Sequence, residues 1–276
     1  MNKIFNSVDL IAEIQWVIAI ILMILVFATI LFWIWNKISP SKLVDEMQIR
    51  TRSWWVMCFI FLFASLINPV VTYIALGFLS FFTLREIYSL LNLREMDRSV
   101  LFFCYICIPI QYYLAFKGYY TLFLIFIPVF MFIIIPFLLV LTGETKDIIR
   151  SMCILPTSLM LGVFGISHLA LLISFPEMNT NGVSGKALLL FLIFITEAND
   201  IMQFVWGKIF GKTKILPNVS PNKTWEGFIG GVLSTTVIGY FMGFLTPLSS
   251  LQLIIISPSI AILGFMGDAI LSAVKR

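Results

Sequence analysis

Acidic residues stand inside long apolar stretches in the C-terminal third of the sequence. Glu197 and Asp200 are three residues apart in "ITEANDIMQFVWG", and in "GFMGDAILSAVKR" Asp268 is followed at i+4 and i+7 by Ser272 and Lys275. Helical periodicity places each set on one helix face. A single acid in such a stretch is as easily explained as an interhelical hydrogen-bond partner or a headgroup anchor, but several together indicate function. Clustered carboxylates suit Mg²⁺, which shares its oxygen ligands with substrate phosphates.

A basic segment lies between these acids, at residues 207–226, and ends in "SPNKTWEGFIGG". It contains Lys208, Lys212, Lys214, Pro217, Pro221, Lys223 and Glu226. We expect Ser220 or Thr224 to cap the helix that follows, because the free N–H groups of a helix start bind anions when a lysine is near. Gly227 leaves the first turn without bulk, so a neighbouring helix or a ligand can approach it. The segment therefore predicts a polyphosphate site.

The same segment contains "GKIFGKT", which is similar to a phosphate-binding P-loop. The glycine spacing is one residue short, and an apolar helix precedes it where a P-loop needs a strand. We therefore do not predict a P-loop.

Membrane helices are the elements that must position these residues. The chain has 276 residues, of which 60% are hydrophobic and 12% charged, and apolar runs able to cross a hydrocarbon core of about 30 Å recur throughout. We predict an all-α polytopic membrane protein with about nine transmembrane helices, at 14–35, 54–67, 69–84, 100–116, 119–141, 152–174, 186–206, 227–247 and 251–273. The second and third spans are short, and a re-entrant hairpin at Asn68-Pro69 is the alternative.

The distribution of Lys and Arg predicts the orientation. With the N-terminus outside, the connections at 36–53, 85–99, 142–151 and 207–226 and the C-terminal end hold 15 of the 18 basic residues. This bias predicts a cytoplasmic C-terminus and a multi-pass protein of the inner membrane with its acids and lysines on the cytoplasmic face. The net charge of +4 then describes a basic rim that suits anionic lipids and phosphorylated substrates rather than nucleic acid.

Other reactive side chains give no competing site. The four cysteines fall in apolar helical stretches, so neither a disulfide framework nor a zinc cluster is expected. The one histidine, His168, lies in mid-membrane, where an interhelical hydrogen bond is favoured over catalysis. We expect a single membrane domain over 1–276, with a helical scaffold at 1–190 and the motif-bearing part at 191–276.

Three spaced motifs in the last part of the chain carry a resemblance to a known family. They read D-x6-G-x3-G-K from Asp200 to Lys212, P-x2-SP-x-KT-x-EG-x2-GG from Pro217 to Gly231, and GD-x3-S-x2-KR from Gly267 to Arg276. Together they resemble the phosphatidate cytidylyltransferase (CDP-diacylglycerol synthase) family of membrane enzymes. The likeness is tight over roughly the last 80 residues and elsewhere extends only to hydrophobic helices.

The resemblance implies an activity and a set of roles. The family condenses phosphatidic acid with CTP, releases pyrophosphate and forms CDP-diacylglycerol with Mg²⁺, and its members often form homodimers, which we also expect here. By resemblance, Asp268 is a metal ligand and acts with Asp200 and Glu226 in catalysis. The remaining implied roles are nucleotide-phosphate binding by Lys212, Ser220, Lys223, Thr224 and Gly227, and lipid-phosphate binding by Ser272, Lys275 and Arg276.

Two departures from the family pattern shape the expectations. Phe204 stands where members usually have a tyrosine, and the sequence given stops at Arg276, where members continue with further acidic metal ligands. We therefore expect the chain alone to show little or no cytidylyl transfer, unless a separate C-terminal segment supplies those ligands. A non-catalytic protein that binds nucleotide or anionic lipid is the alternative. A transporter is disfavoured, since no inverted repeat is evident.

Overall fold

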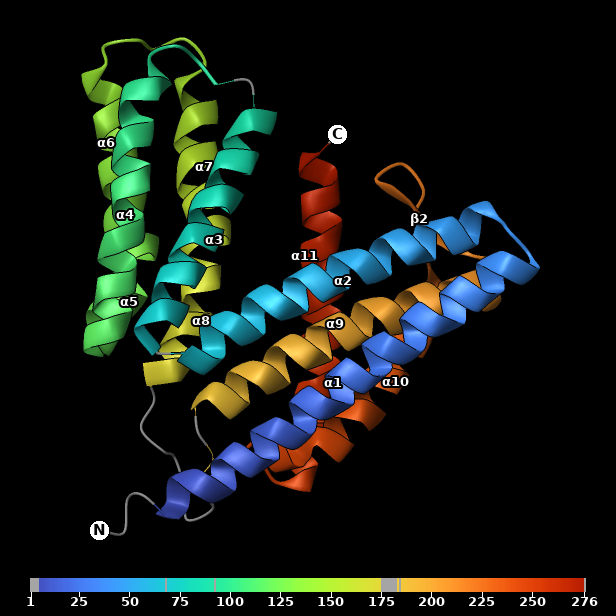
Figure 1. Cartoon of the computed structure of the whole chain (residues 1–276). Helices are drawn as coiled ribbons and strands as arrows, with labels where there is room; N and C mark the ends of the chain where they lie inside the picture. Colours follow the sequence, from blue (N-terminus) through green and yellow to red (C-terminus); the bar gives the residue numbers. More distant parts are fainter. Residues whose placement is uncertain (1–4, 68, 92, 175–182, 184, 276) are drawn as a thin grey trace. The chain divides into compact units, whose positions relative to one another are not determined.

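Long apolar helices make up most of the chain in the computed structural model, which describes residues 5–67, 69–91, 93–174, 183 and 185–275. The one sheet among these residues is a two-stranded hairpin, so the all-α prediction holds for the membrane helices (Figure 1). The chain divides into two compact units, 1–75 and 76–276, and each is described by itself.

The first unit is built on two antiparallel helices, α1 (Phe5–Ile38) and α2 (Lys42–Ile67), which turn around Pro40. Trp55 Nε1 donates to Thr29 Oγ1 over 3.0 Å, and Gln48 Nε2 donates to the Phe32 carbonyl over 3.1 Å, so polar side chains join the two helices. The predicted loop at 36–53 is largely wrong, because the helix resumes at Lys42. Its Lys, Glu, Gln, Arg and Met residues are strong helix formers.

The second unit begins with a bundle formed by the rest of α3 (Pro69–Leu90) and the helices that follow it. These are α4 (Asp97–Lys117), α5 (Tyr120–Ile125), η1 (Phe126–Met131), α6 (Phe132–Leu141), α7 (Ile148–Leu159), η2 (Met160–Phe164) and α8 (Gly165–Ser174). Phe123, Ile135 and Leu155 are fully buried in its core. Arg94 NH2 pairs with the buried Asp97 at 2.7 Å, and Arg94 NH1 donates to the Lys146 carbonyl over 2.7 Å. This network joins the two loops at one end of the bundle.

Two of the predicted continuous spans contain short π-helical turns, η1 and η2. Pro128 lies inside η1, and Pro156 lies one turn before η2. A proline lacks the N–H that the α-helical ladder needs, and a π-turn accommodates the altered pairing. Within the part of the chain that the structure describes, the contact of the His168 ring nitrogen, just after η2, lies in its own helix and not between helices as we predicted. Its Nδ1 lies 2.7 Å from the Phe164 carbonyl of the preceding turn, and its ring packs edge-on against Phe123 and Phe164.

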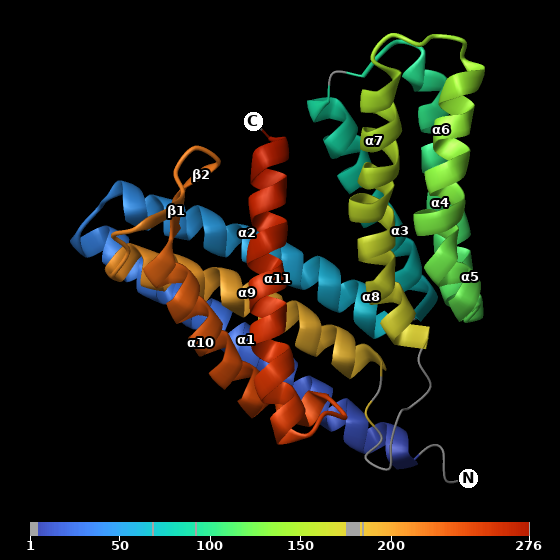
Figure 2. The same cartoon turned by 180° about the vertical axis from the view of Figure 1, so that it is seen from behind.

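The second unit ends with three packed helices that carry the predicted site. They are α9 (Gly185–Ile209), α10 (Trp225–Phe241), which continues as the 3-10 turn η3 (Met242–Leu245), and α11 (Ser250–Val274). α10 packs along α9 and also contacts α11, which crosses α9 in both views (Figures 1 and 2). Asn199 on α9 is buried and joins all three, because its Nδ2 donates to the Ala261 carbonyl over 3.3 Å and its Oδ1 accepts from Thr235 Oγ1 over 3.4 Å.

Glycines set how closely α10 approaches α9. A Cβ on Gly227 would lie 2.8 Å from the Gln203 carbonyl oxygen and 3.0 Å from the Gly207 Cα, and a Cβ on Gly231 would lie 2.3 Å from Gln203 Cγ. Backbone atoms cannot move aside as a flexible side chain can. A neighbouring helix, rather than a ligand, therefore fills the space left by these two glycines.

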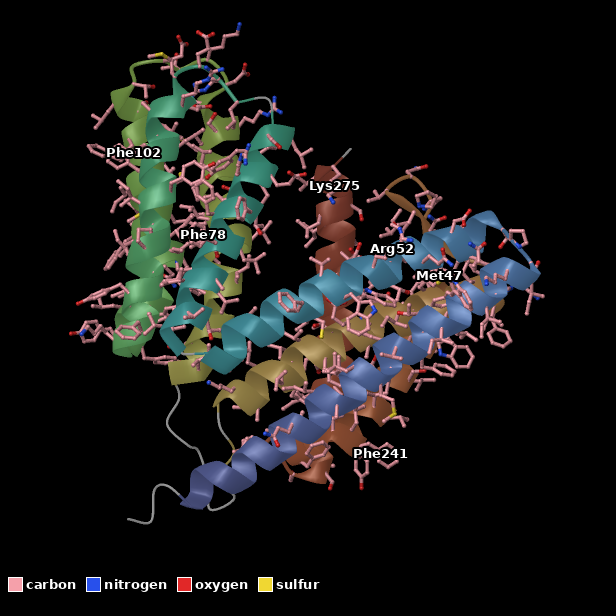
Figure 3. All side chains as sticks on the ribbon, viewed as in Figure 1. Met47, Arg52, Phe78, Phe102, Phe241 and Lys275 are labelled. Atoms are coloured by element: carbon pink, nitrogen blue, oxygen red, sulfur yellow. The ribbon has the colours of Figure 1, made fainter. Side chains whose placement is uncertain are left out.

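Eight helices in the described part of the chain are long and apolar enough to cross a membrane, and each matches one predicted span. The ninth prediction, 54–67, falls in α2, where most side chains lie outside the described residues. The 22-residue α3 extends to Leu90, beyond the predicted end at 84, and is long enough to cross the bilayer alone. Phe241 on α10 and Phe102 on α4 point outward (Figure 3) and are 73% and 64% exposed, as expected for lipid-facing side chains.

Replacing Gly227 by alanine should destabilise the protein, because the added methyl group would overlap backbone atoms of α9. We expect a loss of about 1–3 kcal/mol. The matched control is Gly267→Ala on α11, where a Cβ would meet nothing within 4 Å and alanine should slightly favour the helix. Thermal unfolding in detergent checks this. Equal melting temperatures for the two variants would contradict the packing described.

Candidate active site

A β-hairpin, not an irregular loop, connects α9 to α10. Strand β1 (Lys214–Leu216) pairs antiparallel with β2 (Ser220–Thr224), with Lys214 opposite Thr224 and Leu216 opposite Ser220. The hairpin extends beyond the ends of the two helices, on the side where α11 ends (Figures 1 and 2). The prediction of a proline-stiffened basic loop missed these strands, which are short and lack the apolar alternation typical of a strand.

The carboxylate of Glu226, in the first turn of α10, holds the start of the hairpin. Its oxygens accept from the backbone N–H of Lys212 over 3.1 Å and from that of Thr213 over 3.2 Å. The Thr213 carbonyl in turn accepts from the backbone N–H of Trp225 over 3.0 Å. Glu226 therefore positions the segment that carries Lys212, and both of its oxygens are used in doing so.

Thr224, one of the two N-cap residues that we predicted for this helix, caps α10. It is buried, its backbone is extended, and its Oγ1 accepts from the backbone N–H of Gly227 over 3.2 Å. A Cβ on Gly211 would lie 2.7 Å from Thr224 Oγ1, so the end of α9 packs on the cap. The other candidate cap, Ser220, is half-buried in β2.

Lys223 on β2 and Asp268 on α11 form a salt bridge between Nζ and Oδ2. The Lys223 side chain is 18% exposed and that of Asp268 is 48% exposed. Lys223 Nζ also lies 5.1 Å from the ring centre of Phe265, which packs against Phe228 at 4.7 Å between ring centres. The pairing joins the phosphate-site lysine and the metal-ligand aspartate predicted from separate motifs.

The remaining predicted residues are less closely grouped. Lys212 and Lys275 are exposed, the latter at the end of α11 (Figure 3). Ser272 Oγ donates to the Asp268 carbonyl of its own helix over 2.7 Å. Asp200 is exposed on α9. Arg276 lies outside the described residues.

A resident metal centre is not evident in the described part of the chain, where no three acidic, histidine or cysteine side chains are grouped closely enough to hold an ion. Asp268 offers a half-exposed carboxylate in the last two turns of α11. Mg²⁺ is commonly held by one or two carboxylates and completed by water and substrate phosphates. The donor set therefore fits a metal that arrives with a phosphorylated substrate, with Asp268 as its protein ligand.

Sequence reasoning missed two residues that organise the site. Asn199 joins the three helices. Its side-chain amide stands within an apolar helical run, and because buried polar groups need partners, this position could have predicted an interhelical bond. Phe265 lies beside the Lys223 ammonium group. Its role could not be predicted from the sequence, because apolar helices of this chain contain many phenylalanines.

Comparison with known proteins places the chain. A model of the cytidylyltransferase family matches residues 48–276, which is most of the chain. The chain belongs to the cytidylyltransferase family. It is 36% identical over 264 residues to the Escherichia coli protein YnbB, described as uncharacterized, and the match covers 94% of this chain and 85% of that protein.

Enzymes of the family are similar over a shorter stretch. The phosphatidate cytidylyltransferase of Chlamydia pneumoniae is 41% identical over 93 residues, 31% of this chain and 30% of the enzyme. That of Aquifex aeolicus is 38% identical over 88 residues, 32% of this chain and 33% of the enzyme. Each match thus spans about a third of these cytidylyltransferases. No solved structure matches the chain. The resemblance inferred from the motifs is confirmed, and by family the chain is a nucleotidyltransferase.

Replacing Glu226 by alanine should loosen the hairpin, because the backbone N–H groups of Lys212 and Thr213 would lose their acceptor. We expect faster trypsin cleavage after Lys212 and Lys214 in the detergent-solubilised protein. The control is Glu95→Ala, which removes an exposed acid from the loop before α4. Unchanged cleavage in the Glu226 variant would show that the carboxylate does not hold the loop.

Proposed function

We propose that this protein transfers the cytidylyl group of CTP to phosphatidic acid, forming CDP-diacylglycerol and pyrophosphate in phospholipid biosynthesis. The observation that carries the proposal is the Lys223–Asp268 pair, which lies beside the capped start of α10. A cation for phosphates and a carboxylate for a metal are parts that nucleotidyl transfer needs. Membership of the family supports the same assignment.

The proposed chemistry requires no protein nucleophile. A phosphate oxygen of phosphatidic acid forms a bond to the α-phosphorus of CTP, and the bond from that phosphorus to the bridging oxygen of the β-phosphate breaks, releasing pyrophosphate. Lys212 and Lys223 bind the nucleotide phosphates beside the first turn of α10, where Thr224 caps Gly227 and Ser220 lies on the adjoining strand β2. Mg²⁺, when bound at Asp268, neutralises charge that develops on the phosphate oxygens.

The other assigned residues hold or orient groups. Glu226 keeps Lys212 in place through the backbone, and Asp200 orients ligands or lysines from α9. We assign the phosphate of the lipid substrate to Ser272 and Lys275, which follow Asp268 along the chain to the end of α11, and, from the sequence motif alone, to Arg276. The lipid then stays in the bilayer while its headgroup reaches the basic end of the helices.

A binding protein without catalysis is the second candidate. The observation that favours it is that the described residues group no three metal-ligating side chains. Such a protein would bind CTP or anionic lipid through the same lysines. We propose, in addition, a homodimer in the inner membrane.

Purified chain in vesicles containing phosphatidic acid should convert labelled CTP into CDP-diacylglycerol in the presence of Mg²⁺. Asp268→Asn should lower the rate by several powers of ten, since a metal that neutralises developing charge lowers the barrier by several kcal/mol. Lys223→Ala should weaken CTP binding more than Lys117→Ala. CTP binding with no transfer in any form would favour the binding protein.

Orientation can be measured directly. A cysteine introduced in place of Lys212 should be protected from a membrane-impermeant thiol reagent in intact cells and should react once the membrane is permeabilised. The reason is the excess of Lys and Arg on that side of the predicted spans. A cysteine in place of Lys117, on the opposite side, is the control and should react in intact cells. The reverse pattern would overturn the predicted topology.

A further inference from the structure

Lys223 pairs with the carboxylate that we assign to the metal ion. Its ammonium group contacts Oδ2 of Asp268 and lies 5.1 Å from the centre of the Phe265 ring. In this state the lysine assigned to nucleotide phosphates and the aspartate assigned to the metal neutralise each other. Each must give up this contact before its full charge can act on the proposed ligand.

An ammonium group and a divalent cation cannot share this carboxylate without a penalty. Like charges a few ångströms apart repel each other, and the repulsion doubles when one charge is divalent. A nucleotide triphosphate removes the conflict, because its oxygens bind lysine and metal alike. Binding of the nucleotide and of the metal should therefore be linked through this pair.

We propose that Lys223 is the built-in counter-ion of Asp268 and that the site loads by exchange. The nucleotide phosphates take over the Lys223 ammonium, and a divalent cation takes its place on Asp268. This inference rests on the proposed function and deepens it. It makes Lys223 a positioning residue for the metal site as well as a phosphate ligand, and it makes Phe265 a positioning residue for Lys223.

The surrounding structure allows the side chain to move while the backbone stays. The hairpin is held by Glu226 through the backbone of Lys212 and Thr213, and by the pairing of its two strands. None of these bonds involves the Lys223 side chain. The Phe265 ring attracts the ammonium group when it leaves the carboxylate, because the ring face carries partial negative charge.

The exchange makes two reciprocal expectations. Removing the lysine should strengthen metal binding by the ligand-free protein, and removing the aspartate should strengthen nucleotide binding when no metal is present. Both expectations follow from one salt bridge. The metal must displace the lysine from Asp268, and the nucleotide must displace the aspartate from Lys223, so either substitution removes the same competitor. A salt bridge that merely supports the fold predicts the opposite, since its loss would weaken both.

The first test measures Mn²⁺ alone, by electron paramagnetic resonance, on the full chain in nanodiscs. Mn²⁺ takes the same oxygen ligands as Mg²⁺. Lys223→Met should lower the Kd for Mn²⁺ about tenfold, the value of losing one competing charge-assisted contact. Lys223→Arg, which keeps the cation, should bind as the wild type does, and so should Lys214→Met, which removes a neighbouring exposed charge from the hairpin. The double variant Lys223→Met with Asp268→Asn should lose the gain.

The second test measures labelled CTP binding by equilibrium dialysis in EDTA. Asp268→Asn should bind CTP several-fold more tightly than the wild type, and addition of Mn²⁺ should help the wild type but not this variant. Unchanged Mn²⁺ affinity in Lys223→Met, or weaker CTP binding in Asp268→Asn, would overturn the exchange even though the wild type binds CTP. A wild type that binds no CTP under any condition would overturn the proposed function, and the exchange with it.

Discussion

The close contact between α9 and α10 is the interaction on which the candidate site depends. Gly207 and Gly227 bring the two backbones together, and this approach sets where Thr224 caps α10 and where the hairpin leaves the helix ends. In a bilayer, helix association gains little from the hydrophobic effect, because lipid tails are as apolar as the side chains. Close van der Waals packing and a few polar contacts, such as those of Asn199, must therefore hold these helices together.

Charge is concentrated where this packing ends. Glu226 neutralises free backbone donors at the hairpin, and Lys223 meets Asp268 from the neighbouring helix. Glu226, Lys223 and Asp268 thus each have a polar partner close to the apolar surface of the helices, where an isolated charge would be costly. The same arrangement leaves Lys212 and Lys275 exposed, and their charge can attract phosphorylated ligands or anionic lipids.

The helices could be predicted from the sequence because a membrane span needs a long run of apolar residues, and eight predicted spans coincide with helices of the structure. Spacing also gave the site motifs, and the family resemblance that they carry places Lys223 and Asp268 in one predicted site. The hairpin, the helical region after Lys42 and the π-turns were missed. The hairpin depends on tertiary contacts and the π-turns on the accommodation of proline, while the region after Lys42 is helical through the propensity of its polar residues. A count of apolar residues contains none of these.

Asn199 has a mechanical consequence for the three helices that it joins. Because it bonds to α10 and α11 at once, sliding α11 past α10 would leave a buried amide group without a partner, at a cost of about 1–3 kcal/mol. Water cannot replace that partner inside the packed helices, whereas it can replace a broken bond at an exposed helix end. A motion that keeps Asn199 paired must therefore move α9, α10 and α11 together at this level.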